Sequence, residues 1–459
     1  MTNLYLPWMS ERTLDIVGGG LAGSEAAWQL AERGHHVVLH EMRPVRGTAA
    51  HKTDRLAELV CSNTFKSTEV TNAHGLLKAE MRLLGSMILR AADEARVAAG
   101  SALGVDRDVF SATVHDWVTS HPRITVVRDE VTALPAIGII ATGPLTSDAL
   151  TTAIRARLGV DGLSFYDAIA PIVSVDSIDH GIVFRASRYG KETMDGASDE
   201  GAYLNCPFTR DEYEAFLDAL GAADQFTAHE FDKVPYFEGC MPVEEIAGRG
   251  RETLRFGPMK PVGLVDPRTA REAYAIAQLR MEDRAGQMWN LVGFQTRLRI
   301  PEQKRVFQMI PGLAEAEFLR FGSIHRNSYL NSPGTLSPHL ALRDAPLTMF
   351  AGQLTGVEGY TESTATGILA AINLARQLAG DDVVIPPPTT MLGALYRYLR
   401  EADPRHFQPM NANFGLMEDL GQRIRDKRVK REKLAERALS EMSAWRDMHA
   451  ASFTAVASR

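Results

Sequence analysis

The sequence has few cysteines and no long uncharged apolar run. Its three cysteines, Cys61, Cys206 and Cys240, form no CxxC pair and are too few for a disulfide framework in a chain of 459 residues. No stretch reaches the roughly 18 apolar residues that a membrane helix requires, and residues 1–12 lack the apolar core of a signal peptide. We therefore expect a soluble protein of the reducing cytoplasm, with no membrane partner.

An excess of positive charge is also absent. The chain carries 50 Lys and Arg against 57 Asp and Glu, a net charge of −7, so any contact with RNA requires a local basic patch. The 13 histidines form no HExxH motif, and no carboxylates show metal-ligand spacing, so we expect no metal site. With 45% hydrophobic and 23% charged residues the chain is an ordinary globular protein, long enough for two or three domains.

The first 45 residues contain a dinucleotide-binding fingerprint. Residues 13–17 predict a buried strand, which leads directly into GGGLAG, a match to GxGxxG, and residues 24–33 predict a helix. Residues 36–40 predict a second strand, at whose end Glu41 can accept hydrogen bonds from ribose hydroxyls. The glycines let the backbone approach a pyrophosphate that the helix N-terminus stabilises. The predicted cofactor-binding residues are Gly18, Gly19, Gly20, Leu21, Ala22, Gly23 and Glu41.

Two later segments favour a flavin over a freely exchanging nicotinamide. Residues 137–143 form an apolar run that closes on Ala-Thr-Gly, and residues 347–352 predict another buried strand, followed by a long helix at 363–379. A late strand, glycine, short loop and helix is typical of the closing segment of two-part flavoproteins, where the helix N-terminus faces the flavin. We add Gly143, Gly352 and Gln353 to the FAD site; the alternative is an ordinary helix–strand layer without a ligand.

The sequence between these segments predicts an insertion. We expect an α/β protein in which residues 1–200 and 321–459 form a discontinuous, Rossmann-like FAD-binding domain. A smaller α+β domain at residues 201–320 is inserted into it. Helices are predicted in this insertion at residues 211–220, 268–290 and 302–310, and a final helical region runs to about residue 448.

A basic run near the end of the chain has two interpretations that stay open. Such a run is most often a solvated helix face with i,i+4 ion pairs. The alternative is a patch that contacts RNA phosphates, helped by arginines of the insertion such as Arg249, Arg251 and Arg255. Asp426 and Glu432 are the only acidic residues within the run, whose basic residues are Arg423, Arg425, Lys427, Arg428, Lys430, Arg431 and Lys433.

Two of the cysteines lie in polar surroundings. Cys61 stands in ELVCSNTFK, soon after the first strand–helix–strand unit. Cys240 precedes Pro242, which suits the first position of a short helix, and a helix N-terminus favours the thiolate of a cysteine. Cys206 has no such activation signal. For any single cysteine, a buried inert thiol remains the alternative.

These motifs together resemble the folate- and FAD-dependent tRNA (uracil-5-)-methyltransferases, the TrmFO family. Two departures are mild: Gly19 stands where the family often has Ala, and HRNSYLNSP replaces the more usual HRNTFINSP. The region after about residue 385 is less similar, so its role toward RNA stays open. In order along residues 18–367, the resembling segments are GGGLAGSEAAWQLAERG, HEMRP, ELVCSNTFKS, GLLKAEM, IIATGPLTS, YLNCPF, YFEGCMPVEE, GFQTRLRIPEQKRVF, HRNSYLNSP and AGQLTGVEGYTESTATG.

The resemblance implies methylation of uridine at C5 in RNA, by family analogy at position 54 in the T-loop of tRNA. The carbon would come from 5,10-methylenetetrahydrofolate, the electrons from reduced FAD, and NADH or NADPH would re-reduce the flavin. Cys61 and Cys240 match the two reactive cysteines of the family. Arg43, in HEMRP, joins the FAD-site residues, and His325 and Arg326 would contact folate or RNA. Folate and the target base would share the cleft between the two domains.

Two thiols would divide the chemistry between them, because a thiolate that adds to uracil C6 is consumed as a covalent bond and cannot also remove the C5 proton. We favour Cys240 as the nucleophile and Cys61 as the base or as a guard of the flavin, although the opposite assignment is nearly as well supported. Three alternatives stay open: a generic FAD-dependent oxidoreductase acting on a small metabolite, a ribosomal-RNA uridine methyltransferase of the same family, and a flavin-containing RNA-binding protein without turnover. We expect no DNA partner.

Overall fold

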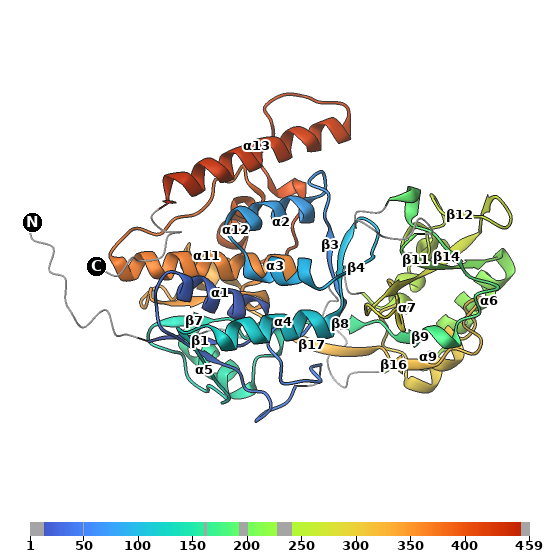
Figure 1. Ribbon diagram of the computed structural model, residues 1–459, viewed down its shortest axis with the longest axis horizontal. Coiled ribbons are helices and arrows are strands. Elements are labelled where there is room, and N and C mark those ends of the chain that lie inside the picture. The colour runs from blue at the N-terminus through green and yellow to red at the C-terminus, as the bar shows by residue number, and fades with distance from the viewer. Residues whose placement is uncertain (1–12, 49, 160–162, 192–200, 227–240, 451–459) are drawn as a thin grey trace, which may run out of the picture.

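The structure is a computed structural model that describes residues 13–48, 50–159, 163–191, 201–226 and 241–450. Two units, each built on a sheet of its own, lie side by side (Figure 1). The larger unit combines a five-stranded sheet with the long helices, and the smaller unit is built on a six-stranded sheet. Among the helices of the described ranges, none is long and apolar enough to cross a membrane.

The five-stranded sheet is entirely parallel and carries the predicted nucleotide fold. Its order is β18-β7-β1-β2-β6. Such sheets are covered on both faces, which explains why its short strands are mostly apolar. The strands β1, β7 and β18 and the helix that follows β1 all lie where the sequence predicts them. The bounds are β1 Leu14–Val17, α1 Leu21–Glu32, β2 Val37–His40, β6 Ile124–Val127, β7 Gly138–Ile140 and β18 Thr348–Phe350.

Helix α11 (Tyr360–Ala379) packs closely against α1. A side chain at Gly367 would place its Cβ only 2.4 Å from the carbonyl oxygen of Ala22, so the approach of the two helices requires a glycine there. The remaining elements of this unit are β3 Thr64–Ser67, α2 Ala73–Leu83, α3 Met87–Glu94, β4 Arg96–Val97, β5 Ala102–Val105, α4 Arg107–Ser120, η2 Gly143–Leu145, α5 Asp148–Leu158, α10 Ser332–Thr335, η6 Gln353–Thr355, α12 Met391–Glu401, η7 Phe414–Leu416 and α13 Lys427–Met448.

The six-stranded sheet of the smaller unit has the order β10-β11-β14-β15-β9-β16, and its neighbouring strands are antiparallel. Helices α6 (Arg210–Ala222) and α9 (Ile300–Phe307) confirm two of the predicted helices. They enclose an apolar core that includes Phe216, Phe294 and Phe307. The other elements are β9 Ile172–Ser174, η3 Val175–Ser177, β10 Phe184–Arg185, η4 Arg188–Gly190, β11 Tyr203–Phe208, α7 Val243–Gly248, α8 Thr253–Phe256, β12 Val265–Asp266, β13 Arg271–Glu272, β14 Ala275–Met281, β15 Met288–Leu291 and β16 Phe318–Arg320.

The predicted amphipathic helix at residues 268–290 is wrong. This stretch includes β13, β14 and most of β15, and all of β14 except its last residue pairs with β11, from Tyr203 opposite Arg280 to Phe208 opposite Ala275. Ala, Gln, Leu, Arg and Met in β14 are strong helix formers, but the pairing with β11 overrides that propensity. The insertion is therefore less helical than the sequence suggests.

The strands of the second sheet also show where this sheet begins along the chain. The sequence division at residue 201 leaves β9 and β10 with the first part of the chain, yet both strands belong to the six-stranded sheet. A two-stranded antiparallel ribbon, β8 (Leu163–Ile169) with β17 (Ser323–Tyr329), flanks this sheet in the chain. The second sheet thus begins near residue 170.

Candidate functional site

A cleft lies at the carboxyl ends of β1, β2, β7 and β18, where an open parallel sheet binds its ligands. Its space is about 1040 Å³, including the part that is open to solvent. Every cofactor-binding residue predicted from the sequence, except Gly23, lines this cleft. Those residues are Gly18, Gly19, Gly20, Leu21, Ala22, Glu41, Arg43, Gly143, Gly352 and Gln353.

Three glycines of the GxGxxG motif differ in what surrounds them. Gly18 has a φ of +107°, and a Cβ there would lie 2.6 Å from the carbonyl oxygen of Ala141. A Cβ at Gly23 would lie 1.8 Å from the carbonyl oxygen of Gly18, so this glycine sets the packing of α1 behind the turn. A Cβ at Gly20 would meet nothing within 4 Å. Gly20 therefore leaves a cradle in the cleft wall that a side chain would fill.

The two long helices that point into the cleft begin without a capping side chain. Helix α1 starts after Gly20 and α11 after Gly359, and neither N-terminus receives a side-chain hydrogen bond. In contrast, side chains cap α2, α3, α4, α5, α6, α12 and α13. The first backbone amides of α1 and α11 are thus left to a ligand, and helix N-termini bind anions such as a pyrophosphate. These features fit FAD.

Glu41 is buried at the edge of the cleft and is held by its neighbours. Its carboxylate accepts hydrogen bonds from the backbone amide of Gly19 at 3.1 Å and from the guanidinium of Arg43 at 2.9 and 3.0 Å. Burial alone would raise the pKa of Glu41, but the hydrogen bonds and charge of Arg43 outweigh it and lower that pKa. Glu41 therefore stays an ionised acceptor. Arg43 also donates to Glu58 at 3.2 Å, so in this structure it orients two acids of the cleft wall.

Cys61 is half-buried at the junction of the two units, in a segment whose backbone is held from several sides. The amides of Cys61 and Ser62 donate to the hydroxyl of Tyr360 at 2.9 and 3.1 Å. Arg107 donates to the carbonyl of Leu59 at 2.7 Å. Val60 and Tyr360 both line the cleft, which places the Cys61 segment beside it.

Charged residues from both units meet behind this segment. Arg107 of α4 donates to Glu282, which follows β14, at 2.6 Å, and Arg320 of β16 donates to the carbonyl of Val60 at 3.0 Å. Asn63 donates to the carbonyl of Met281 at 2.8 Å. The second unit therefore contributes directly to the position of Cys61.

The other two cysteines differ sharply. Cys206 lies in β11, fully buried, and burial raises the pKa of its thiol to about 12, so it is a packed and inert thiol. Cys240 lies outside the described residues. Helix α7 begins at Val243 with Pro242 as its N-cap, one residue later than the sequence suggests.

His325 and Arg326, the predicted folate or RNA contacts, lie in a two-stranded ribbon. The backbone of His325 and Arg326 lies in β17, opposite Asp167 and Tyr166 of β8. Within the described ranges there is also no group of three or more His, Cys, Asp or Glu that could hold a metal ion.

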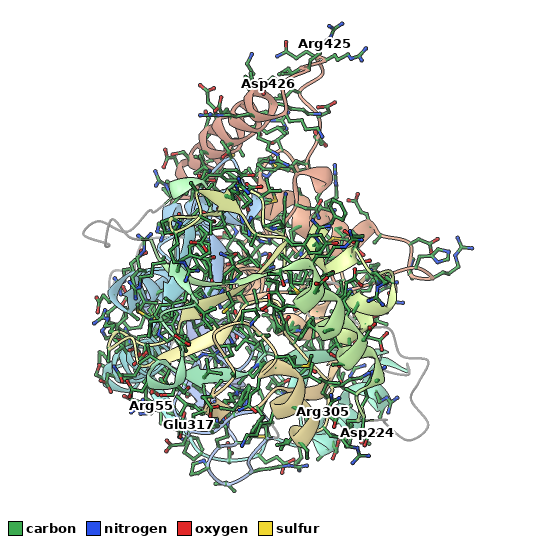
Figure 2. The ribbon with its side chains drawn as sticks, turned by 90° about the vertical axis from the view of Figure 1, so that its right-hand side faces the viewer. Arg55, Asp224, Arg305, Glu317, Arg425 and Asp426 are labelled. Carbon is green, nitrogen blue, oxygen red and sulfur yellow. The ribbon has the colours of Figure 1, made fainter. Side chains whose placement is uncertain are left out.

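The basic run lies along the start of α13, at an extremity of the molecule where Arg425 and Asp426 project (Figure 2). Arg428 pairs with Glu432 at 2.9 Å in i,i+4 spacing, and both side chains are exposed. Lys430 pairs with Asp419, also at 2.9 Å. These contacts are those of a solvated helix face, and exposed pairs of this kind contribute little to stability.

Sequence reasoning missed four residues that meet at the Cys61 segment: Tyr360, Arg107, Arg320 and Glu282. Tyr360 stands inside the AGQLTGVEGYTESTATG segment, next to glycines that could have indicated a contact with the cofactor. The other three carry no local signal, because they become neighbours only when the second sheet packs against the first unit.

Comparisons with known proteins agree with this geometry. The family model for glucose inhibited division protein A (GidA) matches residues 13–382. A methylenetetrahydrofolate--tRNA-(uracil-5-)-methyltransferase TrmFO of Geobacter sulfurreducens is 57% identical over 94% of this chain and 98% of that protein. One from Brevibacillus brevis is 54% identical over 94% of this chain and 97% of that protein. Among solved structures, GidA of Aquifex aeolicus is similar in fold, with a TM-score of 0.66 at 14% identity, over 94% of this chain and 73% of that one. The chain belongs to the TrmFO family of methylenetetrahydrofolate--tRNA-(uracil-5-)-methyltransferases.

Proposed function

We propose that this protein is a folate- and FAD-dependent methyltransferase that forms 5-methyluridine in tRNA. The observation that carries the proposal is the position of Cys61. Its segment lies beside a cleft that has the glycine turn, the acid and the two uncapped helix N-termini of an FAD site. Relatives that are more than half identical over nearly the whole chain carry the same activity in their names.

Residues of the cleft would hold the cofactor as follows. The amides at the start of α1, next to Gly20, would bind the pyrophosphate, and the Glu41 carboxylate would accept bonds from the ribose. The start of α11, next to Tyr360, would face the flavin ring with its positive end. When bound, FAD supplies the hydride that no side chain can provide, and NADH or NADPH would restore it.

The chain's own residues would prepare the uracil. A thiolate that adds to C6 makes C5 nucleophilic, and a second group must then take the C5 proton. We assign these two tasks to Cys61 and Cys240, with Cys240 the favoured nucleophile and Cys61 the favoured base. Tyr360, through the amides of Cys61 and Ser62, is a positioning residue for this step.

We also propose a target nucleoside, a cellular location and a domain organisation. We expect uridine 54 in the T-loop of tRNA as the target, with ribosomal RNA as the alternative, and we expect the enzyme to work in the cytoplasm. We also propose a discontinuous FAD-binding domain that contains an inserted domain. The insertion would start near residue 170, because β9 belongs to the second sheet.

The test is an assay with purified FAD-loaded protein, methylene-labelled tetrahydrofolate, NADPH and unmodified tRNA. The proposal expects label in 5-methyluridine and in no other nucleoside, and a parallel reaction with ribosomal RNA should give none. NADPH oxidation without transfer of label to RNA would instead favour a generic flavin oxidoreductase. Binding of tRNA without any turnover would favour an RNA-binding flavoprotein.

A further inference from the structure

Three cations gather where the Cys61 segment meets the second unit. Arg107 and Arg320 donate to consecutive carbonyls of this segment, at Leu59 and Val60, and they are close enough for the charge of Arg107 to lower the pKa of Arg320. Lys52 is the third cation, and its backbone amide donates to Glu58 at 2.8 Å. Burial lowers the pKa of Lys52, and the positive charges of Arg320 and Arg107 lower it further. The cluster therefore presents positive charge next to Cys61.

The carboxylates close to this cluster already have hydrogen-bond or ion-pair partners. Glu282 forms an ion pair with Arg107 at 2.6 Å. Glu58 accepts hydrogen bonds from Arg43, from the amides of Lys52 and Thr53 and from the hydroxyl of Thr53. No carboxylate of the described residues lies within ion-pair distance of Arg320 or of the Lys52 ammonium.

A partly buried guanidinium without a counter-ion is costly, because it has lost part of its hydration and gained no charge partner. Burial lowers the pKa of Arg320, and the neighbouring Arg107 lowers it further; Tyr360, Glu282 and Cys61 oppose this shift but do not outweigh it. The only hydrogen bond of Arg320 among the described residues goes to a carbonyl, through one of its nitrogens. The remaining donors of its planar fork suit a phosphate, which Arg binds with two parallel hydrogen bonds.

We propose that Arg320, assisted by Lys52, binds a backbone phosphate of the RNA strand whose uridine enters the cleft beside Cys61. The inference rests on the proposed function and adds the contact that holds the substrate strand. A uridine that reaches Cys61 must leave its base stack, so its own phosphates come close to the cleft mouth. The second unit would thus bind the substrate and, through the same guanidinium, fix the carbonyl of Val60.

The experiment measures binding of an unmodified tRNA transcript to the FAD-loaded protein across a range of salt concentrations. Arg320→Gln should weaken binding about tenfold and should reduce the slope of log K against log salt by about 0.7 to 0.9, the value for one lost phosphate contact. Arg320→Lys keeps the charge but lacks the planar fork, so it should restore the slope and only part of the affinity. The matched control is Arg343→Gln, since Arg343 likewise donates to backbone carbonyls, but at Leu336 and Gly334, which lie outside the Cys61 segment.

The outcomes separate this inference from the proposed function. If the wild-type protein methylates tRNA and Arg320→Gln binds it with unchanged affinity and slope, only the phosphate site is overturned. Equal loss of affinity in Arg320→Gln and Arg320→Lys, with the salt slope unchanged in both, would mean that Arg320 acts only by holding Val60, and it too would overturn the site. A raised KM for folate with unchanged tRNA binding would assign the anion to a folate carboxylate instead. A wild-type protein that neither binds nor methylates tRNA would remove the proposed function itself. The flavin absorbance spectrum of each variant serves as the folding control.

Discussion

The hydroxyl of Tyr360 accepts hydrogen bonds from the amides of Cys61, at 2.9 Å, and of Ser62, at 3.1 Å, although 299 residues separate Tyr360 from Cys61 in the chain. Tyr360 is the first residue of α11, whose N-terminus faces the cleft. This single hydroxyl therefore connects the backbone of Cys61 to the helix that would face the flavin. Together with the bonds that Arg107 and Arg320 donate to Leu59 and Val60, this contact fixes the Cys61 backbone relative to the start of α11.

Tyr360→Phe should reduce methylation about tenfold while FAD remains bound. The substitution removes the acceptor of two amides and leaves both without a partner, which costs on the order of 1–3 kcal/mol and frees the Cys61 segment to move. Single-turnover methylation, with the flavin spectrum recorded in parallel, checks this. Tyr398→Phe is the matched control, because its hydroxyl also bonds to backbone, at Gln408, but lies away from Cys61. Equal activity of the two variants would contradict a positioning role for Tyr360.

Two glycine substitutions in the same motif should have different effects, one on FAD binding and the other on the stability of the fold. Gly20→Ala should fold normally but bind little FAD, because its Cβ has open space in the protein and would fill the cradle in the cleft. Gly23→Ala should destabilise the fold itself, by about 1–3 kcal/mol, because its Cβ would overlap the carbonyl oxygen of Gly18. Bound flavin per protein and the free energy of urea unfolding distinguish the two.

Gly221→Ala provides the control for these variants. Gly221 lies in α6 with no atom near its added Cβ, so the change should stabilise the helix by about 0.5–1 kcal/mol and leave FAD binding unchanged. If Gly20→Ala takes up FAD as well as Gly221→Ala does, the glycine turn is not the pyrophosphate site.

Asn63→Ala should lower the free energy of unfolding by about 2–4 kcal/mol. The buried Asn63 amide donates to the carbonyls of Val105 and Met281, and its oxygen accepts from Arg280 at 2.8 Å. Removing it leaves these buried polar groups unpaired at the junction of the two units. Urea unfolding measures the loss. Asn413→Ala, which removes two contacts of a less buried residue, should cost less than about 1 kcal/mol, and a similar cost for both would argue against a special role of the junction.

Lys78 should make stability rise with pH above neutrality. Burial lowers the pKa of Lys78 to about 7; the charge of Glu362 opposes this, and those of Arg82 and Lys66 add to it. Between pH 7 and 10.5 the unfolded chain holds this proton and the folded chain does not, so stability increases with pH across that window. The measured quantity is the unfolding free energy of the wild-type protein minus that of Lys78→Met, which should increase from about pH 7 to about pH 10.

The subtraction removes contributions common to both proteins. Glu80, whose pKa burial raises to about 8, gives the opposite slope between about pH 4.5 and 8, because the folded state then holds the extra proton. Parallel curves for the wild-type protein and Lys78→Met would show that Lys78 keeps an ordinary pKa in the folded state.

Local sequence predicted the first unit well and the second unit poorly, for physical reasons. The turn at Gly18 to Gly23 and the acid at Glu41 are local features, because the chain between them is a single strand–helix–strand unit, and the structure places them as expected. The residues of β14 favour a helix, but pairing with β15 and with β11, some 70 residues away, makes this stretch a strand. Arg320 and Glu282 carry no local signal for a role at Cys61, since that role arises from the packing of the two units.

The central claim is that the uridine is methylated next to Cys61 in the FAD cleft, and one measurement tests it most directly. Wild-type protein and Cys61→Ala, both loaded with FAD, are incubated with methylene-labelled tetrahydrofolate, NADPH and unmodified tRNA, and the T-loop fragment is analysed by mass spectrometry. The account predicts one labelled methyl group on that fragment for the wild-type protein and none for Cys61→Ala at equal flavin content. Full labelling by Cys61→Ala, or no labelling by the wild-type protein, would contradict it.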